Sequence, residues 1–133
     1  MRVYIAGPIA GKPNGNRAAF AAKSLELRVA GHDTVNPHHV PPWHHDGDCP
    51  EGLPAGEGGS HTAPCYMRAD LAEMLTCDAI YLLDDWDSSQ GARIEYLLAV
   101  HVVGLKLLNP EAVPPHVDAP GAVLAAFGTE AAA

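Results

Sequence analysis

The stretch "LLDDWDSSQGARIEYLLAV", residues 82–100, joins the end of one regular element to the start of the next. Its first residues complete "AIYLLDD" (79–85), a short apolar run typical of a buried strand. A polar turn with one glycine follows, and the residues after it are typical of a helix whose first turn carries Glu95. Such a carboxylate either complements the helix macrodipole or lies at the carboxyl edge of a parallel sheet, where α/β proteins bind ligands.

The rest of the chain repeats this alternation of strand and helix. The sequence predicts strands at 2–6, 33–37, 79–85 and 105–109, helices at 15–31, 65–77 and 91–104, and a weak Ala-rich helix at 121–127. We therefore expect an α/β fold: a doubly wound (flavodoxin- or Rossmann-like) parallel sheet of four to five strands, in a single domain over residues 1–133. Residues 37–64 are rich in Pro, Gly and His, which predicts a long loop without regular structure.

Composition narrows the classes of function. The chain has 133 residues, of which 47% are hydrophobic, enough for one domain with a substantial core. Sixteen acidic residues against eight Lys and Arg give a net charge of -8, which argues against a nucleic-acid partner. No apolar run approaches the length of a membrane span, and "MRVYIAGPIAG" is too short and too interrupted by glycine for a signal peptide. We expect a cytoplasmic protein without a membrane partner, whose three cysteines are reduced.

Polar residues follow three of the predicted strands, where the carboxyl ends of parallel strands share one edge. Asp70 joins them if its helix starts at the same edge. Taken singly, Tyr4 is typical of a core residue, Asp70 of a solvated or capping residue, and His39 of a loop histidine. Together, a carboxylate pair, a tyrosine and a histidine around one pocket indicate catalysis. The polar residues concerned are Tyr4, Asn36, His38, His39 and the segment 85–95.

Four segments together resemble one known superfamily. They are "YIAGPIAG" (4–11), "VNP" (35–37), "DLAEMLTCDAIYLLDDW" (70–86) and "SSQGARIEYLLA" (88–99). The combination, with an AGP motif and a W-x-x-S-x-G-A-x-x-E motif, resembles the nucleoside 2-deoxyribosyltransferase-like superfamily. It is most similar to the phage and bacterial branch of small proteins called DUF4406. The resemblance covers residues 2–107 apart from most of the long loop, and the superfamily includes 2'-deoxynucleoside 5'-phosphate N-hydrolases.

The resemblance implies three catalytic roles. The glutamate that follows the glycine after the third strand is the superfamily's nucleophile, which corresponds to Glu95 after Gly91. Cleavage of an N-glycosidic bond needs a carboxylate beneath the anomeric carbon and a proton donor for the departing base. Asp70 is the candidate donor. The superfamily's opening tyrosine, matched by Tyr4, holds the glutamate by a hydrogen bond that keeps it ionised, and we expect its position in the helix to help.

The resemblance also suggests the substrate. Transferases that act on free nucleosides place an aspartate six residues before the nucleophile, whereas the 5'-phosphate hydrolases place a serine, as Ser89 is here. A serine hydroxyl attracts a phosphate that an aspartate would repel. However, Ala10 stands where the hydrolases carry an arginine, with Lys12 a candidate replacement, and acidic residues 85 and 87 oppose a phosphate. The expected substrate-binding residues are Gly7, Pro8, Ile9, His39, Trp86, Ser88, Ser89 and Gly91.

These residues favour an N-glycosidase that cleaves the base–sugar bond of a (deoxy)nucleoside 5'-monophosphate. The alternatives are a nucleoside 2-deoxyribosyltransferase, which exchanges bases through the same glycosyl-enzyme, and a nucleotide-binding protein without turnover. The expected partner is a small nucleotide or nucleoside, and we expect no cofactor. Members of the superfamily assemble as dimers or larger, so the resemblance also implies a homo-oligomer.

The long loop carries a second cluster of reactive side chains. His45 with Cys49 and His61 with Cys65 supply the ligand types of a tetrahedral zinc site, although their spacing is not that of a standard zinc finger. We assign no metal to the catalytic chemistry. The same residues also allow a disulfide between Cys49 and Cys65, or a lid that closes over the substrate with Trp43 stacked on the base.

Overall fold

The structure is a computed structural model that describes residues 1–43, 49 and 61–115. Its sheet has four parallel strands in the order β2-β1-β3-β4. This arrangement confirms the predicted α/β fold with a flavodoxin- or Rossmann-like parallel sheet. The strands are β1 (Arg2–Ala6), β2 (Asp33–Val35), β3 (Ala79–Leu82) and β4 (Lys106–Leu107). The helix expected at 121–127 lies outside the described residues.

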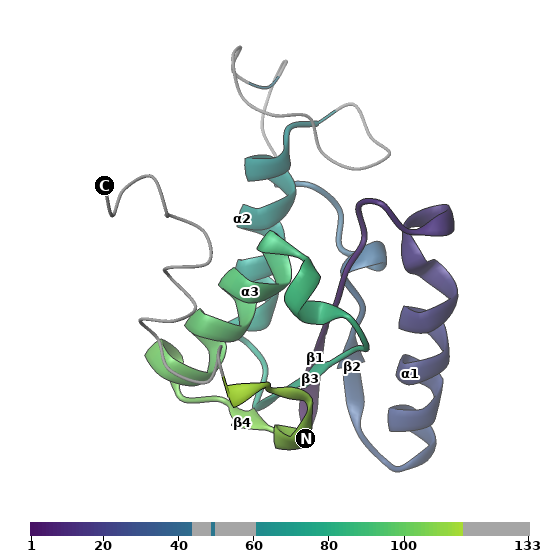
Figure 1. The fold of residues 1–133 in the computed structure, drawn as a ribbon, viewed down its shortest axis with the longest axis vertical. Helices are drawn as coiled ribbons and strands as arrows, with labels where there is room; N and C mark the ends of the chain where they lie inside the picture. Colours follow the sequence, from purple (N-terminus) through teal and green to yellow (C-terminus); the bar gives the residue numbers. More distant parts are fainter. Residues whose placement is uncertain (44–48, 50–60, 116–133) are drawn as a thin grey trace.

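Helices cover both faces of the sheet, because side chains alternate between the faces along each strand. Val3 and Ile5 of β1 pack with Phe20 and the rest of α1 (Arg17–Val29). Tyr4 and Ala6 point to the other face and belong to the core beneath α2 (Ala63–Met74) and α3 (Gln90–Tyr96). Figure 1 shows α1 on one side of the strands and α2 with α3 on the other. The fold is therefore doubly wound, as predicted.

The boundaries of the predicted elements differ from the observed ones by a few residues. The helix expected at 91–104 is the seven-residue α3 followed by a π-helical segment, η4 (Leu97–Val103). The predicted loop is not wholly irregular, since it begins with a single 3-10 turn, η2 (Pro37–His39), and α2 begins before its end, with a proline in the first turn. Among the described residues, no helix is both long and apolar enough to cross a bilayer.

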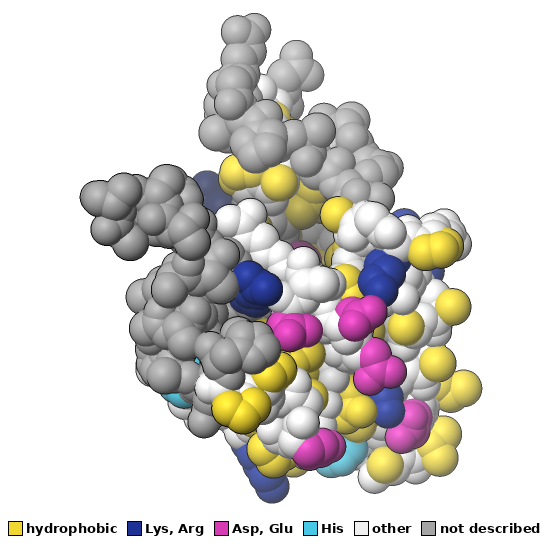
Figure 2. Space-filling model, in the orientation of Figure 1, with side chains coloured by type: hydrophobic (Ala, Val, Ile, Leu, Met, Phe, Trp, Pro, Cys, Tyr) yellow, Lys and Arg dark blue, Asp and Glu magenta, His cyan; other side chains and the backbone are white. Residues whose placement is uncertain are grey.

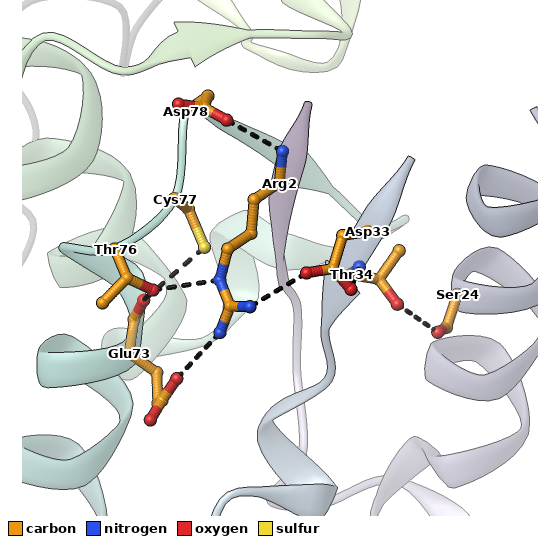
Figure 3. Close-up of polar contacts among 8 residues, drawn as sticks. All are labelled: Arg2, Ser24, Asp33, Thr34, Glu73, Thr76, Cys77 and Asp78. Atoms are coloured by element: carbon orange, nitrogen blue, oxygen red, sulfur yellow. Dashed lines mark hydrogen bonds and ion pairs between the residues drawn. The ribbon is translucent and has the colours of Figure 1, made fainter. Parts of the chain in front are cut away.

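Arg2 links the segments that meet at the amino edge of the sheet through hydrogen bonds (Figure 3). Its backbone N–H donates to Asp78 at 2.9 Å, and its guanidinium donates to Asp33 at 2.9 Å, Glu73 at 3.0 Å and Thr76 at 3.0 Å. Asp33 begins β2, Glu73 lies in the last turn of α2, and Thr76 and Asp78 lie between α2 and β3. The opposite, carboxyl edge of the sheet is where a cavity opens.

Candidate active site

A cavity of about 670 Å³ lies at the carboxyl edge of the sheet, within the size range of small-molecule sites. The loop after β1, with the turn η1 (Pro13–Asn16), forms one wall, and α2 and α3 form the other. Figure 2 shows this side of the molecule hollowed between α2 and that loop. The residues that line the cavity include Gly7, Ile9, Lys12, Arg17, His38, Asp70, Ser89, Gly91 and Glu95.

The predicted catalytic residues converge here from three elements. Tyr4, on β1, donates a hydrogen bond from its hydroxyl to Glu95 Oε2, on α3, at 2.6 Å. Tyr4 is fully buried and Glu95 is only 6% exposed. Asp70, on α2, is half-buried and lines the same cavity as Glu95. The structure thus brings together three side chains that the chain separates by up to 91 residues.

The protonation of the carboxyl pair differs from the expectation. Burial raises the pKa of Glu95 to about 8; the Tyr4 hydrogen bond lowers it by less than burial raises it, and the Asp70 charge raises it further. Burial also raises the pKa of Asp70 to about 7. Glu95 is the sixth residue of α3, beyond its first turn, so the helix terminus does not hold it ionised as expected. Both carboxyls are therefore partly protonated near neutral pH.

Tyr4 is a donor throughout this range. Its pKa lies well above the usual value, first because the hydroxyl is buried and then because the Glu95 and Asp70 charges oppose a phenolate. Because Tyr4 stays protonated, its hydroxyl donates to Glu95 and does not itself become the charged group. The hydrogen bond therefore favours the ionised form of Glu95, although burial raises the pKa of this carboxyl by more than the hydrogen bond lowers it.

The two serines of the motif differ in their surroundings. Ser89 lines the cavity and caps α3, its Oγ accepting from the Ala92 N–H at 3.2 Å, so its hydroxyl proton remains for another acceptor. Ser88 is exposed, donates to the Asp85 carbonyl at 2.7 Å and is not among the lining residues. Gly91 lines the cavity beside Ser89. Of the two serines, Ser89 lines the cavity and Ser88 does not.

Two cations line the wall that faces these carboxyls. Lys12 forms an ion pair with Asp85 at 2.8 Å, and this hydrogen bond lowers the pKa of Asp85. The ion pair uses part of the charge of Lys12, the candidate replacement for the arginine of the hydrolases. Arg17, which the sequence reasoning missed, is exposed and has no hydrogen bond or ion pair with the part of the chain that the structure describes. Its position at the start of a helix after a glycine-containing loop is a recognisable indication of anion binding.

The first loop approaches β3 closely at Gly7. A Cβ at this position would lie 2.8 Å from Leu83 Cβ, so only glycine lets the loop pack there. Gly7 and Ile9 line the cavity, whereas Pro8 is fully buried and is not among its lining residues. The AGP motif therefore shapes the cavity wall through packing.

The structure places His38 in the cavity, and not the predicted His39. The His38 Nε2 lies 2.7 Å from the Gly15 carbonyl, and its ring packs against Phe20. Burial lowers the pKa of His38, so the ring is neutral and its N–H donates to Gly15. His39 lines a separate cavity that includes Arg2. In a 3-10 turn, neighbouring side chains point about 120° apart, so one residue's difference changes the cavity that a histidine reaches.

Trp86, expected to contact substrate, lies in the core. It is 2% exposed, its Nε1 donates to the Ala112 carbonyl at 2.8 Å, and its ring lies 5.0 Å from that of Tyr96. It is not among the lining residues. The tryptophan of the motif therefore anchors the turn before α3, which sets the direction in which that helix leaves the sheet.

Three of the four candidate zinc ligands lie together. One ligand atom from each of Cys49, His61 and Cys65 lies within 4.8 Å of the others, while His45 is outside the described residues. Both cysteines are thiols, so the alternative disulfide is not formed. Trp43, expected to stack on a base in a lid, instead contacts the Arg68 guanidinium at 4.2 Å and does not line the cavity.

One comparison with known proteins gives a family. The model of the family described as "Domain of unknown function (DUF4406)" matches residues 1–109. No match is found among curated proteins or among solved structures. The matched residues contain every strand and α-helix of the described part of the chain, and every residue placed in the cavity. With most of its length matched, the chain belongs to the DUF4406 family.

Proposed function

We propose that the protein is an N-glycosidase that cleaves the base–sugar bond of a (deoxy)nucleoside 5'-monophosphate, with Glu95 as the nucleophile. The observation that carries the proposal is the buried Tyr4–Glu95 hydrogen bond at a cavity that Asp70 also lines. The proposal includes a relationship between the DUF4406 family and the nucleoside 2-deoxyribosyltransferase-like superfamily.

The free-energy cost of burying two carboxyls, Glu95 and Asp70, favours a catalytic protein over one that only binds its ligand. A buried carboxyl whose pKa lies at about 8 destabilises the fold whenever it ionises. Two such groups at one cavity are expected where chemistry needs an acid and a base with displaced pKa values. A protein that only binds nucleotides would gain more from neutral hydrogen-bonding groups at these positions.

The proposed reaction has two steps. A Glu95 carboxylate oxygen attacks C1' of the sugar, the N-glycosidic bond breaks, and its electron pair leaves with the base, which takes a proton from Asp70. Water then attacks C1', Asp70 accepts a proton from that water, and the bond from the sugar to Glu95 breaks. The products are the free base and the sugar 5-phosphate, and both carboxyls return to their starting states.

The reaction needs the proton of the carboxyl pair on Asp70 and the negative charge on Glu95. Burial raises the pKa of both carboxyls, so both are partly protonated near neutral pH. Positive charge that develops at C1' favours a carboxylate on Glu95, as does the Tyr4 hydroxyl. The single proton of the pair then resides on Asp70, where the base needs it. Bound substrate would therefore promote ionisation of the nucleophile.

The facing wall favours a phosphate on the substrate. Arg17 begins α1, a 13-residue helix whose N-terminus also attracts anions, and Lys12 and Ser89 line the same cavity. Within the described residues, Lys12 has an acidic partner, Asp85, and Arg17 has none. Arg17 and Lys12 lie on the wall across the cavity from α2 and α3, and Ser89, which caps α3, would contact the phosphate from the other side.

A panel of nucleosides and their 5'-monophosphates tests the proposal. Free-base release is followed by chromatography, for wild type and for Glu95→Gln, which keeps the size of the side chain and an acceptor for Tyr4. We expect release from monophosphates by wild type only, and a sugar-phosphate adduct on the peptide that contains Glu95 in quenched, denatured samples. Base exchange when a second base is added would identify a transferase. Nucleotide binding without release in both proteins would contradict catalysis and identify a binding protein.

Assembly and location remain predictions. We infer a homo-oligomer from the superfamily resemblance, and the apolar side chains of Val102 and Val103 at the end of η4 are 67% and 43% exposed. Size-exclusion chromatography with light scattering tests the oligomer, and a monomer at micromolar concentration would contradict it. The cytoplasmic location is also a proposal.

A further inference from the structure

We propose that Cys49, His61 and Cys65 bind a zinc ion that fixes the start of α2. The three side chains come from two segments, one at position 49 and the other the residues that lead into and begin α2. They lie outside the catalytic cavity, since none of them lines it. The inference is independent of the proposed glycosidase reaction.

The two nitrogen–sulfur distances match those between ligands of tetrahedral zinc, and the two sulfurs lie within 4.8 Å of each other. His61 Nδ1 lies 3.5 Å from Cys49 Sγ and 3.6 Å from Cys65 Sγ. With Zn–S near 2.3 Å and Zn–N near 2.0–2.1 Å, two tetrahedral ligands of these types lie about 3.6 Å apart. One nitrogen, Nδ1, makes both contacts, so it is the ring atom that would bind the metal.

The chemistry of the ligands selects the metal. Two thiolates and an imidazole suit Zn²⁺, whereas Mg²⁺ and Ca²⁺ prefer oxygen ligands. The Thr62 N–H donates to Cys49 Sγ at 3.4 Å, a contact that stabilises a thiolate. Cys65 Sγ lies 3.3 Å from the Trp43 carbonyl, to which the thiol donates in the absence of metal, and metal binding would release this proton. Three protein ligands leave one tetrahedral position for water or a further donor.

The site would tie two parts of the chain to the cavity wall. Cys65 is the third residue of α2, and Ala63, Tyr66 and Asp70 of the same helix line the cavity. Thr62 and Cys49 already share a hydrogen bond, and a zinc ion would add metal–ligand bonds to this contact. Zinc would therefore stabilise the first turn of the helix that carries Asp70.

The test measures metal directly on the full chain without a purification tag. Elemental analysis of the protein, as purified and after loading with zinc under reducing conditions, should give about one zinc per chain. With cobalt in place of zinc, thiolate-to-metal charge transfer in the near ultraviolet and strong visible bands should report tetrahedral sulfur ligation. Chelator should lower the melting temperature of the loaded wild type.

Three variants separate the site from a general effect of losing a side chain. Cys49→Ser and His61→Ala should each weaken zinc affinity by more than about 100-fold, since loss of an outer-shell partner alone costs roughly 10- to 100-fold. Cys77→Ser removes the third cysteine, whose sulfur contacts the Glu73 carbonyl at 3.5 Å, and should retain zinc. Circular dichroism checks that each variant is folded.

Several results would overturn the proposal. These are less than about a tenth of a zinc per chain after loading, a different metal at one per chain, or equal zinc affinity in Cys49→Ser and wild type. A thiol count of one instead of three in the denatured, unreduced protein would show a disulfide and would also overturn it.

Discussion

Replacing Glu95 with glutamine should stabilise the protein at alkaline pH. The amide has nearly the size of the carboxyl group, and its oxygen still accepts the hydrogen bond that Tyr4 donates at 2.6 Å. It cannot ionise. The variant therefore removes the desolvation of a buried charge while it leaves the packing around α3 in place.

The sign and size of this stabilisation follow from the pKa of Glu95, which is raised from 4.5 to about 8. Because the folded state holds this proton more tightly than the unfolded chain, the stabilising contribution is complete below about 4.5 and is lost as pH rises through about 8. At 1.36 kcal/mol per pH unit, the span between the two values sets an upper limit on the order of 5 kcal/mol. The difference in free energy of unfolding between Glu95→Gln and wild type should be larger at pH 9 than at pH 5, by about 2–5 kcal/mol in favour of the variant.

Urea unfolding from pH 5 to pH 9, followed by circular dichroism, measures the difference. Asp84→Asn removes one exposed carboxylate and controls for the change in net charge. The free energies of unfolding of Glu95→Gln and wild type should diverge as pH rises. A difference that stays constant from pH 5 to pH 9, or a wild type that is the more stable at pH 9, would refute the reasoning.

Four further predictions concern the site. Tyr4→Phe removes a hydrogen bond to a charged group, worth about 1.5–3 kcal/mol, and should lower kcat/KM for base release by roughly 10- to 150-fold while raising the pKa of Glu95; unchanged kinetics would contradict the role of Tyr4. The pH dependence of kcat/KM in wild type should be bell-shaped, with limbs near 7 and 8 that belong to the pair. In Asp70→Asn the residual activity should rise with pH through a single midpoint below 8, since the Asp70 charge that raises the pKa of Glu95 is gone. Arg17→Ala should raise KM for monophosphates by about tenfold and leave KM for nucleosides unchanged. An equal rise for both would show that Arg17 does not bind the phosphate.

The convergence of Tyr4 and Glu95 was predictable from the sequence because it depends on topology. Alternating strands and helices with right-handed crossovers require a parallel sheet, and a parallel sheet brings the loops after its strands to one edge. The strand register then sends Tyr4 to the face that α2 and α3 cover. These rules need only the order of the elements, so an error of two residues at a boundary does not affect them.

The choice between neighbouring residues was not predictable in the same way. His38 and His39 differ by one position in a 3-10 turn, and the direction of each side chain depends on where that turn begins. The burial of Trp86 likewise depends on contacts with Ala112 and Tyr96, which no local pattern contains. Arg17 was overlooked because a basic residue in the first turn of a helix also occurs on ordinary solvated surfaces.

The two carboxyls are held in the cavity by different means. Glu95 is buried and bonded to a side chain of β1, the strand that pairs with both β2 and β3, so its position is fixed by the centre of the sheet. Asp70 is half-buried on α2, and no hydrogen bond joins its side chain to the described residues. Its position therefore depends on how firmly α2 is held. An attacking group needs a fixed place beneath one carbon, whereas an acid that serves the departing base must reach a larger and more variable group, and the difference in anchoring matches this division of roles.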